Sequence, residues 1–229
     1  MTKGIVLTAI AVAVMTSSLV AQKLQKFGAD LEKKSVMGKE IRIPYTDMVT
    51  YYGYVKPGSA PDEVKDGKKM YYVYVWIPAI APEIGIRMIS PVPDKMAPEK
   101  TDIISSDYSP NASDRTNYFD TWISFERALD VTAAADAEKK GKSSKWVSYG
   151  DNDDSSELHA QPSGSAYNSV LRITSDTSNP TKSLVMGLYR IGFTTYKVGE
   201  VQGSFLAQIG APVKLPGVKV AKTLEEIAK

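Results

Sequence analysis

Short apolar or alternating segments, each bounded by turn residues, limit what this chain can fold into. They cover residues 48–55, 71–77, 85–90, 119–127, 145–149, 167–173, 184–196 and 200–209. A period of two, or a short apolar run between Gly, Pro, Asn and Asp residues, is typical of strands. Residues 71–77 (YYVYVWI) are apolar on both alternating sets, which predicts a strand covered on two sides.

Helical signals are few. Residues 132–140 (TAAADAEKK) end at Gly141, which suits the position just after a helix. Residues 223–226 (TLEE) form a capping box before a short terminal helix. The turn residues at 197–199 predict a hairpin connection between the last two strands.

These patterns favour a single all-β domain over residues 35–229. No repeat of about 20–50 residues is present, and no change of composition divides residues 35–222. We predict a jelly-roll β-sandwich with one or two short peripheral helices. The number of strands alone does not separate a jelly roll from other sandwiches.

The first residues have the layout of a secretory signal peptide. Lys3 precedes an apolar run at residues 4–15, and small and polar residues follow it to Ala21. We predict a signal peptide over residues 1–21, a polar tether over 22–34, and an exported protein in the periplasm, at the outer-membrane surface or secreted. The run is shorter than the roughly 20 residues that span a bilayer, so no transmembrane span is expected after cleavage. An uncleaved N-terminal anchor is the alternative.

Composition narrows the class of function. The net charge is +2 and no basic stripe stands out, which argues against a nucleic-acid partner. The chain has no cysteine, and His159 is its only histidine, so thiolate chemistry, histidine-based triads and zinc, copper or haem sites lack ligands. No GxSxG, P-loop or GxGxxG motif is present. We predict a binding protein and not an enzyme; a hydrolase with paired carboxylates stays an open alternative.

One acidic stretch, residues 151–157 (DNDDSSE), concentrates hard oxygen atoms of the kind that Ca²⁺ binds. It is not an EF-hand loop, because Ser156 and Pro162 stand where the turn glycine and the bidentate glutamate belong. From these residues alone a solvated acidic loop is the other interpretation, and it is the one that composition favours.

Several sequence blocks resemble the family of the leptospiral major surface lipoprotein. They fall in order along the chain: residues 51–58 (YYGYVKPG), 74–79 (YVWIPA), 87–91 (RMISP), 119–123 (FDTWI), 167–169 (YNS), 187–191 (GLYRI), 193–197 (FTTYK) and 199–205 (GEVQGSF). None of them is a catalytic signature, but together they are specific.

The resemblance implies a jelly-roll protein at the cell surface that binds calcium and, in the best-known members, extracellular-matrix proteins of the host. The calcium ligands it implies fall on Asp120, Thr121, Asp153, Asp154 and Tyr167. Asp120 and Thr121 are consecutive, so both can meet one ion only at a strand end or bulge. The resemblance therefore shifts our interpretation of the acidic stretch from a solvated loop to a Ca²⁺ site.

The chain departs from that family in three places. It has no lipobox cysteine, its acidic stretch is shorter and is interrupted by Asn152, and its charged C-terminal segment is short. We therefore expect no lipid anchor, and matrix adhesion is the least secure of the implied functions. The expected partners are extracellular-matrix proteins or glycans.

The tyrosine-rich strands suggest an alternative function. Tyrosines in alternating strands are mostly core and cross-strand partners. If instead exposed tyrosines or tryptophans line one concave face, a carbohydrate-binding β-sandwich module without a bound metal is favoured, on the analogy of other jelly rolls.

Overall fold

The structure, a computed structural model, describes residues 34–36, 39–41, 45, 47–153, 167–197 and 199–229. The strands are β1 (Lys34–Val36), β2 (Lys39–Ile41), β3 (Asp47–Val55), β4 (Glu63–Lys65), β5 (Lys68–Ile77), β6 (Glu83–Ser90), β7 (Ile103–Ile104), β8 (Thr121–Ala128), β9 (Trp146–Asn152), β10 (Tyr167–Thr174), β11 (Gly187–Thr195), β12 (Gly203–Ala211) and β13 (Lys219–Ala221). Two short helices, α2 (Ala137–Lys140) and α3 (Leu224–Ala228), and three 3₁₀ turns, η1 (Asp94–Met96), η2 (Ser109–Asn111) and η3 (Ala134–Asp136), complete the described part. No helix within it is long and apolar enough to cross a membrane.

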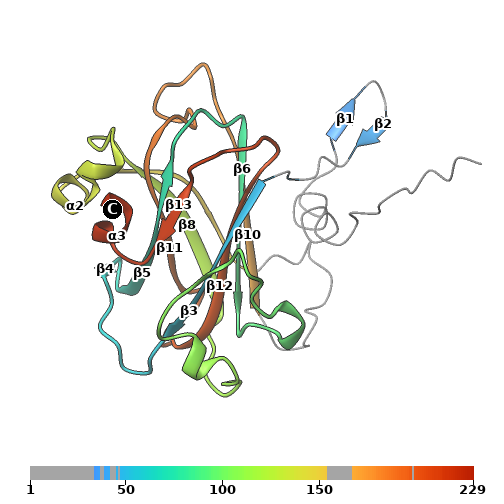
Figure 1. The fold of residues 1–229 in the computed structure, drawn as a ribbon, viewed down its shortest axis with the longest axis vertical. Helices are drawn as coiled ribbons and strands as arrows, with labels where there is room; N and C mark the ends of the chain where they lie inside the picture. The colour runs from blue at the N-terminus through green and yellow to red at the C-terminus, as the bar shows by residue number, and fades with distance from the viewer. Residues whose placement is uncertain (1–33, 37–38, 42–44, 46, 154–166, 198) are drawn as a thin grey trace, which may run out of the picture.

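Two sheets pack face to face (Figure 1). One has the strand order β10-β6-β12-β3-β7, and the other has the order β13-β5-β11-β8-β9, with β4 paired to β5. Within them β3 pairs with β12, β5 with β11, β6 with β10 and β8 with β9, all antiparallel. These four pairs are nested, with the first long strand beside the last, and nesting of this kind is the order of a jelly roll. The predicted all-β sandwich is confirmed.

The predicted strands agree with β3, β5, β6, β8, β9, β10, β11 and β12 to within a few residues at each end. The predicted hairpin at 197–199 is wrong, because β11 and β12 belong to different sheets. Every residue of both strands is buried, so burial cannot tell which sheet either joins. The acidic stretch also starts inside a strand, since Asp151 and Asn152 belong to β9.

The predicted helix at 132–140 is shorter than expected. It consists of η3 followed by the four residues of α2. Gly141 ends it with φ −60°, an ordinary right-handed value, so the expected left-handed cap is absent. A side chain would not fit at Gly141, because a Cβ atom there would lie 2.5 Å from the Ala137 carbonyl oxygen and 2.8 Å from Leu224 of α3. Gly141 therefore serves the packing of α2 against α3. The capping box at Thr223 and Glu226 is present as predicted.

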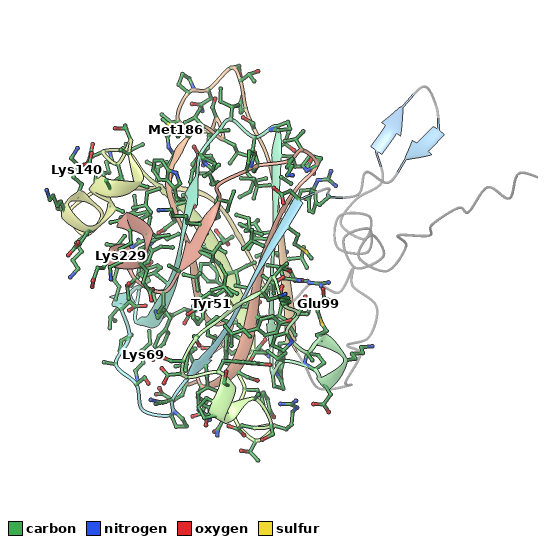
Figure 2. The ribbon with its side chains drawn as sticks, in the orientation of Figure 1. Tyr51, Lys69, Glu99, Lys140, Met186 and Lys229 are labelled. Carbon is green, nitrogen blue, oxygen red and sulfur yellow. The ribbon has the colours of Figure 1, made fainter. Side chains whose placement is uncertain are left out.

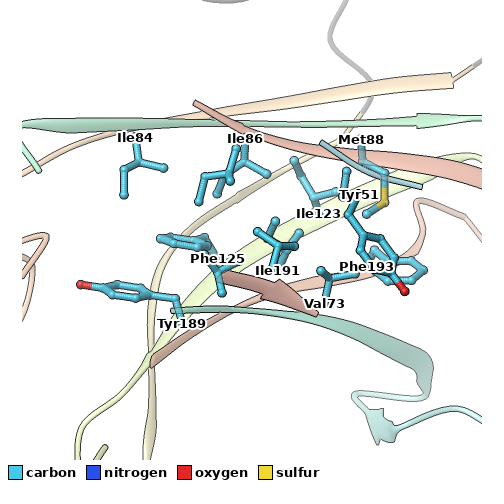
Figure 3. Packing of buried hydrophobic residues seen from close by; sticks show 14 of the residues in the cluster. Tyr51, Val73, Ile84, Ile86, Met88, Ile123, Phe125, Tyr189, Ile191 and Phe193 are labelled. Carbon is cyan, nitrogen blue, oxygen red and sulfur yellow. The ribbon is translucent and has the colours of Figure 1, made fainter. Parts of the chain in front are cut away.

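The space between the sheets is filled by the inward side chains of both (Figure 3). Phe193 contacts several other aromatic rings there, with its ring centroid 4.8 Å from that of Phe205 and 5.8 Å from those of Tyr71 and Phe119. The tyrosines of β3 and β5 pack on both faces of their sheets. Tyr51 and Tyr71 are buried between the sheets, whereas Tyr52 lies in a separate cluster with Tyr108 and Tyr72 lies beneath Arg190 on the outer face, and all four are at most 5% exposed. Burial raises the pKa of Tyr51 to about 12. The interpretation of the tyrosines as packing residues is confirmed for these four.

The two ends of the sandwich differ in which loops they carry. The upper end in Figure 1 holds the start of β3 and residues 78–82, 175–186 and 212–218. The lower end holds residues 91–120, residues 199–202 and the start of β10. The predicted ligands Asp120, Asp153 and Tyr167 all lie at or beside strand ends on the lower side.

Candidate metal centre

A cleft of about 430 Å³ opens at the lower end of the sandwich. Its walls come from the residues before β8, the start of β10 and the connection between β11 and β12: Tyr118, Phe119, Asp120, Tyr167, Thr195, Lys197, Gly199, Glu200 and Gln202. Two of the five predicted calcium ligands, Asp120 and Tyr167, therefore lie in one cleft.

Two contacts fix the position of Asp120, one made by the residue before it and one made by its own carbonyl oxygen. The preceding residue, Phe119, is buried and stacks on Phe193 in the core. The Tyr196 amide donates a hydrogen bond to the Asp120 carbonyl oxygen at 2.9 Å. Because β8 begins at Thr121, the Asp120–Thr121 pair stands at a strand end, as predicted for two consecutive ligands.

Thr121 points into the protein and is fully buried. Its hydroxyl lies 2.7 Å from the Ser169 hydroxyl, which in turn donates to the Thr121 carbonyl oxygen at 2.6 Å. These two bonds join β8 of one sheet to β10 of the other. Both oxygens of Thr121 therefore already have a protein partner, so either one that binds an ion must share it with Ser169.

Tyr167 begins β10, where it pairs with Ser90 of β6. Its ring stacks on Tyr118 across the cleft, with centroids 6.0 Å apart and an interplanar angle of 25°. This contact ties the start of β10 to the segment that carries Asp120. The backbone carbonyl of Tyr167, a neutral oxygen of the kind that Ca²⁺ binds, belongs to the same strand end.

Asp153 directly follows β9 at this end of the sheet. The preceding residue, Asn152, pairs with Ile123 of β8 and donates its side-chain amide to the Val170 carbonyl of β10 at 2.6 Å. The chain at Asp153 is thus fixed to both of the strands that carry the other predicted ligands. Asp154 and His159 lie outside the described residues.

The donor chemistry of the predicted set suits calcium. Carboxylates, carbonyls and hydroxyls are hard oxygen ligands, and Ca²⁺ binds six to eight of them in flexible geometry. Among the described residues, no three His, Cys, Asp or Glu side chains are grouped closely enough to hold a metal ion. The third carboxylate of the predicted set is that of Asp154, so the described part alone does not complete the site.

Sequence reasoning missed several residues of the cleft. Glu200 lies in its wall and pairs with Lys69 through contacts of 2.8 and 2.9 Å, and Lys197 and Gln202 add further polar groups. Tyr118 is 45% exposed. Lys197, Gly199, Glu200 and Gln202 belong to this wall because the chain crosses from one sheet to the other there, which the hairpin prediction did not anticipate.

One nearby carboxylate is already committed to the fold. Asp114 accepts hydrogen bonds from the Tyr54 hydroxyl at 2.6 Å and from the side chains of Asn117 and Thr116. These donors hold the pKa of the Asp114 carboxyl below its ordinary range, the Tyr54 hydroxyl most strongly. The contacts fasten the segment before Tyr118 to β3, which helps to fix the wall of the cleft.

Two comparisons bear on the function. The family model Lipl32, described as surface lipoprotein of Spirochaetales order, matches residues 39–220. That stretch contains both sheets, the cleft and all five predicted ligands. No curated protein matches the chain.

Proposed function

The chain belongs to the family of Spirochaetales surface lipoproteins, and from this premise we propose that it binds calcium and mediates adhesion to extracellular macromolecules. The family is one of surface proteins, in agreement with an exported protein associated with the cell surface. Calcium, adhesion and a non-enzymatic role are the parts of the proposal that go beyond family membership.

The observation that carries the proposal is the convergence of three separate segments at the lower end. Asp120 and Tyr167 line one cleft. Asp153 follows a strand whose last residue is bonded to β8 and β10. Residues far apart in sequence thereby bring carboxylate and carbonyl oxygens to the same strand ends, and these are the atoms that a hard cation requires.

The protein's own residues would make the site a structural one. Asp120, Asp153 and Asp154 would supply charge, and Tyr167 and Thr121 would supply neutral oxygens. A bound Ca²⁺ would supply positive charge that offsets the repulsion among the carboxylates. The residues after β9 would then be tied to β8 and β10, and the cleft would present a fixed surface to a partner.

Calcium is expected to stabilise the protein. At a free Ca²⁺ concentration about 100 times the Kd, binding adds about 2.7 kcal/mol to the free energy of unfolding, which raises the Tm by about 5–10 °C for a chain of this size. Thermal melts in Ca²⁺ and in EDTA measure the difference, and isothermal titration gives the Kd. A matrix-protein pull-down under the same two conditions tests adhesion, which is expected to weaken in EDTA.

The variant Asp153→Ala/Asp154→Ala should lose the Ca²⁺-dependent part of the Tm. The matched control, Asp130→Ala/Glu138→Ala, removes two exposed carboxylates away from the lower end and should keep it. An equal Ca²⁺ response in both double variants would show that the ion binds at another place.

A second candidate function rests on the Tyr118–Tyr167 pair. A 45% exposed tyrosine stacked on a second ring beside polar Asp120 and Gln202 is the arrangement that sugar rings commonly contact. If the cleft binds glycans without a metal, Tyr118→Ala should weaken binding on a glycan array in EDTA by about tenfold, the cost of one aromatic contact. Tyr196→Ala is the control, since Tyr196 is also 45% exposed but does not line the cleft. Equal binding by both variants would exclude this function.

A further inference from the structure

Exposed large apolar side chains are distributed unevenly over the described part of the protein. Three of them, Ile80 (72% exposed), Met186 (46%) and Val213 (40%), belong to the loops of the upper end. Those near the lower cleft are the tyrosines Tyr118 and Tyr196, and Val64 and Ile104 lie apart from both groups. The upper end thus carries aliphatic side chains where the lower end carries aromatic and charged ones. Figure 2 shows Met186 at the upper end and Lys69 toward the lower one.

The three loops lie next to one another. The Ala81 amide donates to the Leu184 carbonyl at 2.9 Å, and Gly187 pairs with Ile77. Loop 212–218 meets loop 78–82 where a Cβ atom at Gly217 would lie 3.8 Å from the Pro78 ring. The prolines at 78, 82, 212 and 216 further restrict these loops. The exposed aliphatic side chains are therefore held on one end surface.

The charged residues of this surface favour contact with lipid headgroups. Loops 78–82 and 212–218 contain no carboxylate, and their one charged residue, Lys214, is exposed. In loop 175–186 the Asp176 carboxylate accepts hydrogen bonds from the Ser178 amide at 2.9 Å and from its hydroxyl at 2.6 Å. Aliphatic side chains beside a lysine are typical of surfaces that enter the boundary between headgroups and acyl chains.

The chain reaches the sandwich at this same end. Tyr45 is buried over Gly85, and β3 starts at Asp47, whose carboxylate accepts from the Leu215 amide at 2.7 Å. The residues before Tyr45 include the apolar run at 4–15. An uncleaved N-terminal anchor, the alternative to signal-peptide cleavage, would attach the chain to the membrane on the side where it enters the upper end. A single membrane signal binds only marginally, and two together bind stably.

We propose that the upper end is a membrane-docking surface, which inserts Ile80, Met186 and Val213 into the headgroup region of a lipid bilayer. This contact is separate from the cleft and needs no calcium. It would set the orientation of a tethered protein, with the lower cleft turned away from the membrane.

The test uses the full chain with vesicles of phosphatidylcholine and phosphatidylglycerol, in EDTA. Flotation of Ile80→Ser/Val213→Ser should show about tenfold weaker binding, because two partly buried aliphatic side chains are lost. The matched control, Val64→Ser/Ile104→Ser, removes the same two residue types from other places and should bind like the parent. Vesicles of phosphatidylcholine alone should bind the protein more weakly than the mixed vesicles, because they offer Lys214 no anionic headgroup.

A second measurement separates docking from attachment by the N-terminal segment alone. The natural chain has no cysteine, so Met186→Cys and Val64→Cys each accept a single environment-sensitive fluorophore. On vesicles the label at 186 should shift to shorter wavelength and the label at 64 should not. Equal flotation of the two double variants, or no shift at 186, would overturn the proposal. A concentration-dependent dimer that only Ile80→Ser/Val213→Ser abolishes would overturn it too, by assigning the surface to a second copy of the chain.

Discussion

Replacement of Arg190 by alanine is expected to lower the free energy of unfolding by about 3 kcal/mol, because it leaves the buried Glu126 carboxylate with the half-exposed Lys65, 3.0 Å away, as its remaining ion-pair partner. Arg190 of β11 is 8% exposed, and its Nε donates to the 4% exposed Glu126 of β8 at 2.6 Å. Its guanidinium lies 3.8 Å from the ring centroid of Tyr72 and 4.3 Å from that of Trp146. One side chain thus joins β5, β8, β9 and β11 on the outer face of their sheet.

Chemical denaturation of three variants gives this prediction its controls. Arg190→Met/Glu126→Leu removes both charges and should recover much of the loss, because no unpaired charge stays buried. Lys69→Ala breaks the exposed pair with Glu200 and should cost less than about 1 kcal/mol. If Arg190→Ala costs no more than Lys69→Ala, the buried pair does not stabilise the sheet.

Gly203→Ala is expected to cost about 4 kcal/mol, from a strained backbone and an overpacked contact together. Gly203 begins β12 with φ +97°, a value that favours glycine. A Cβ atom there would lie 1.9 Å from the carbonyl oxygen of Asn117 and 2.8 Å from the amide nitrogen of Tyr118. The substitution must move the segment that leads into Asp120, so binding at the cleft should weaken as well.

The variant Gly58→Ala separates the cost of the strained backbone from the cost of the overpacked contact. Gly58 has a similar positive φ of +77°, but no atom lies within 4 Å of its Cβ position. Its substitution should cost only about 1 kcal/mol, the backbone term alone. Denaturant titration of both variants measures the difference, and equal losses would mean that the contact with Asn117 relaxes freely.

The strands were predictable because side-chain alternation is a local property. The sheet that each strand joins was not, as β11 and β12 show: both are buried along their whole length and a turn signal stands between them. That signal marks a reversal of the chain, and a reversal within a sheet or between sheets has the same local pattern. The short edge strands β4, β7 and β13 were missed because two or three residues are too few for a period to show.

The candidate site was predictable only through the family resemblance. Asp120 and Tyr167 have no common local signal, and they meet because β8 and β10 end at the same side of the sandwich. The hydrogen bonds between Thr121 and Ser169 could not be predicted from the sequence, since they join the two sheets. Glu200 and Gln202 stayed hidden because their place in the cleft depends on the crossing between β11 and β12.

Because the strand pairs are nested, the sandwich can close only after the last long strand is available. β3 is the first long strand and its partner β12 is the last. Tyr51 of β3 pairs with Ala207 of β12, so this pairing forms only when almost the whole chain is available. Contacts so distant in sequence make folding slow. While a chain of this kind passes through a membrane from its N-terminus, β3 has only the two-residue strand β7 as a partner until nearly all of the chain has emerged. A topology that closes so late suits a polypeptide that crosses a membrane unfolded and folds afterwards.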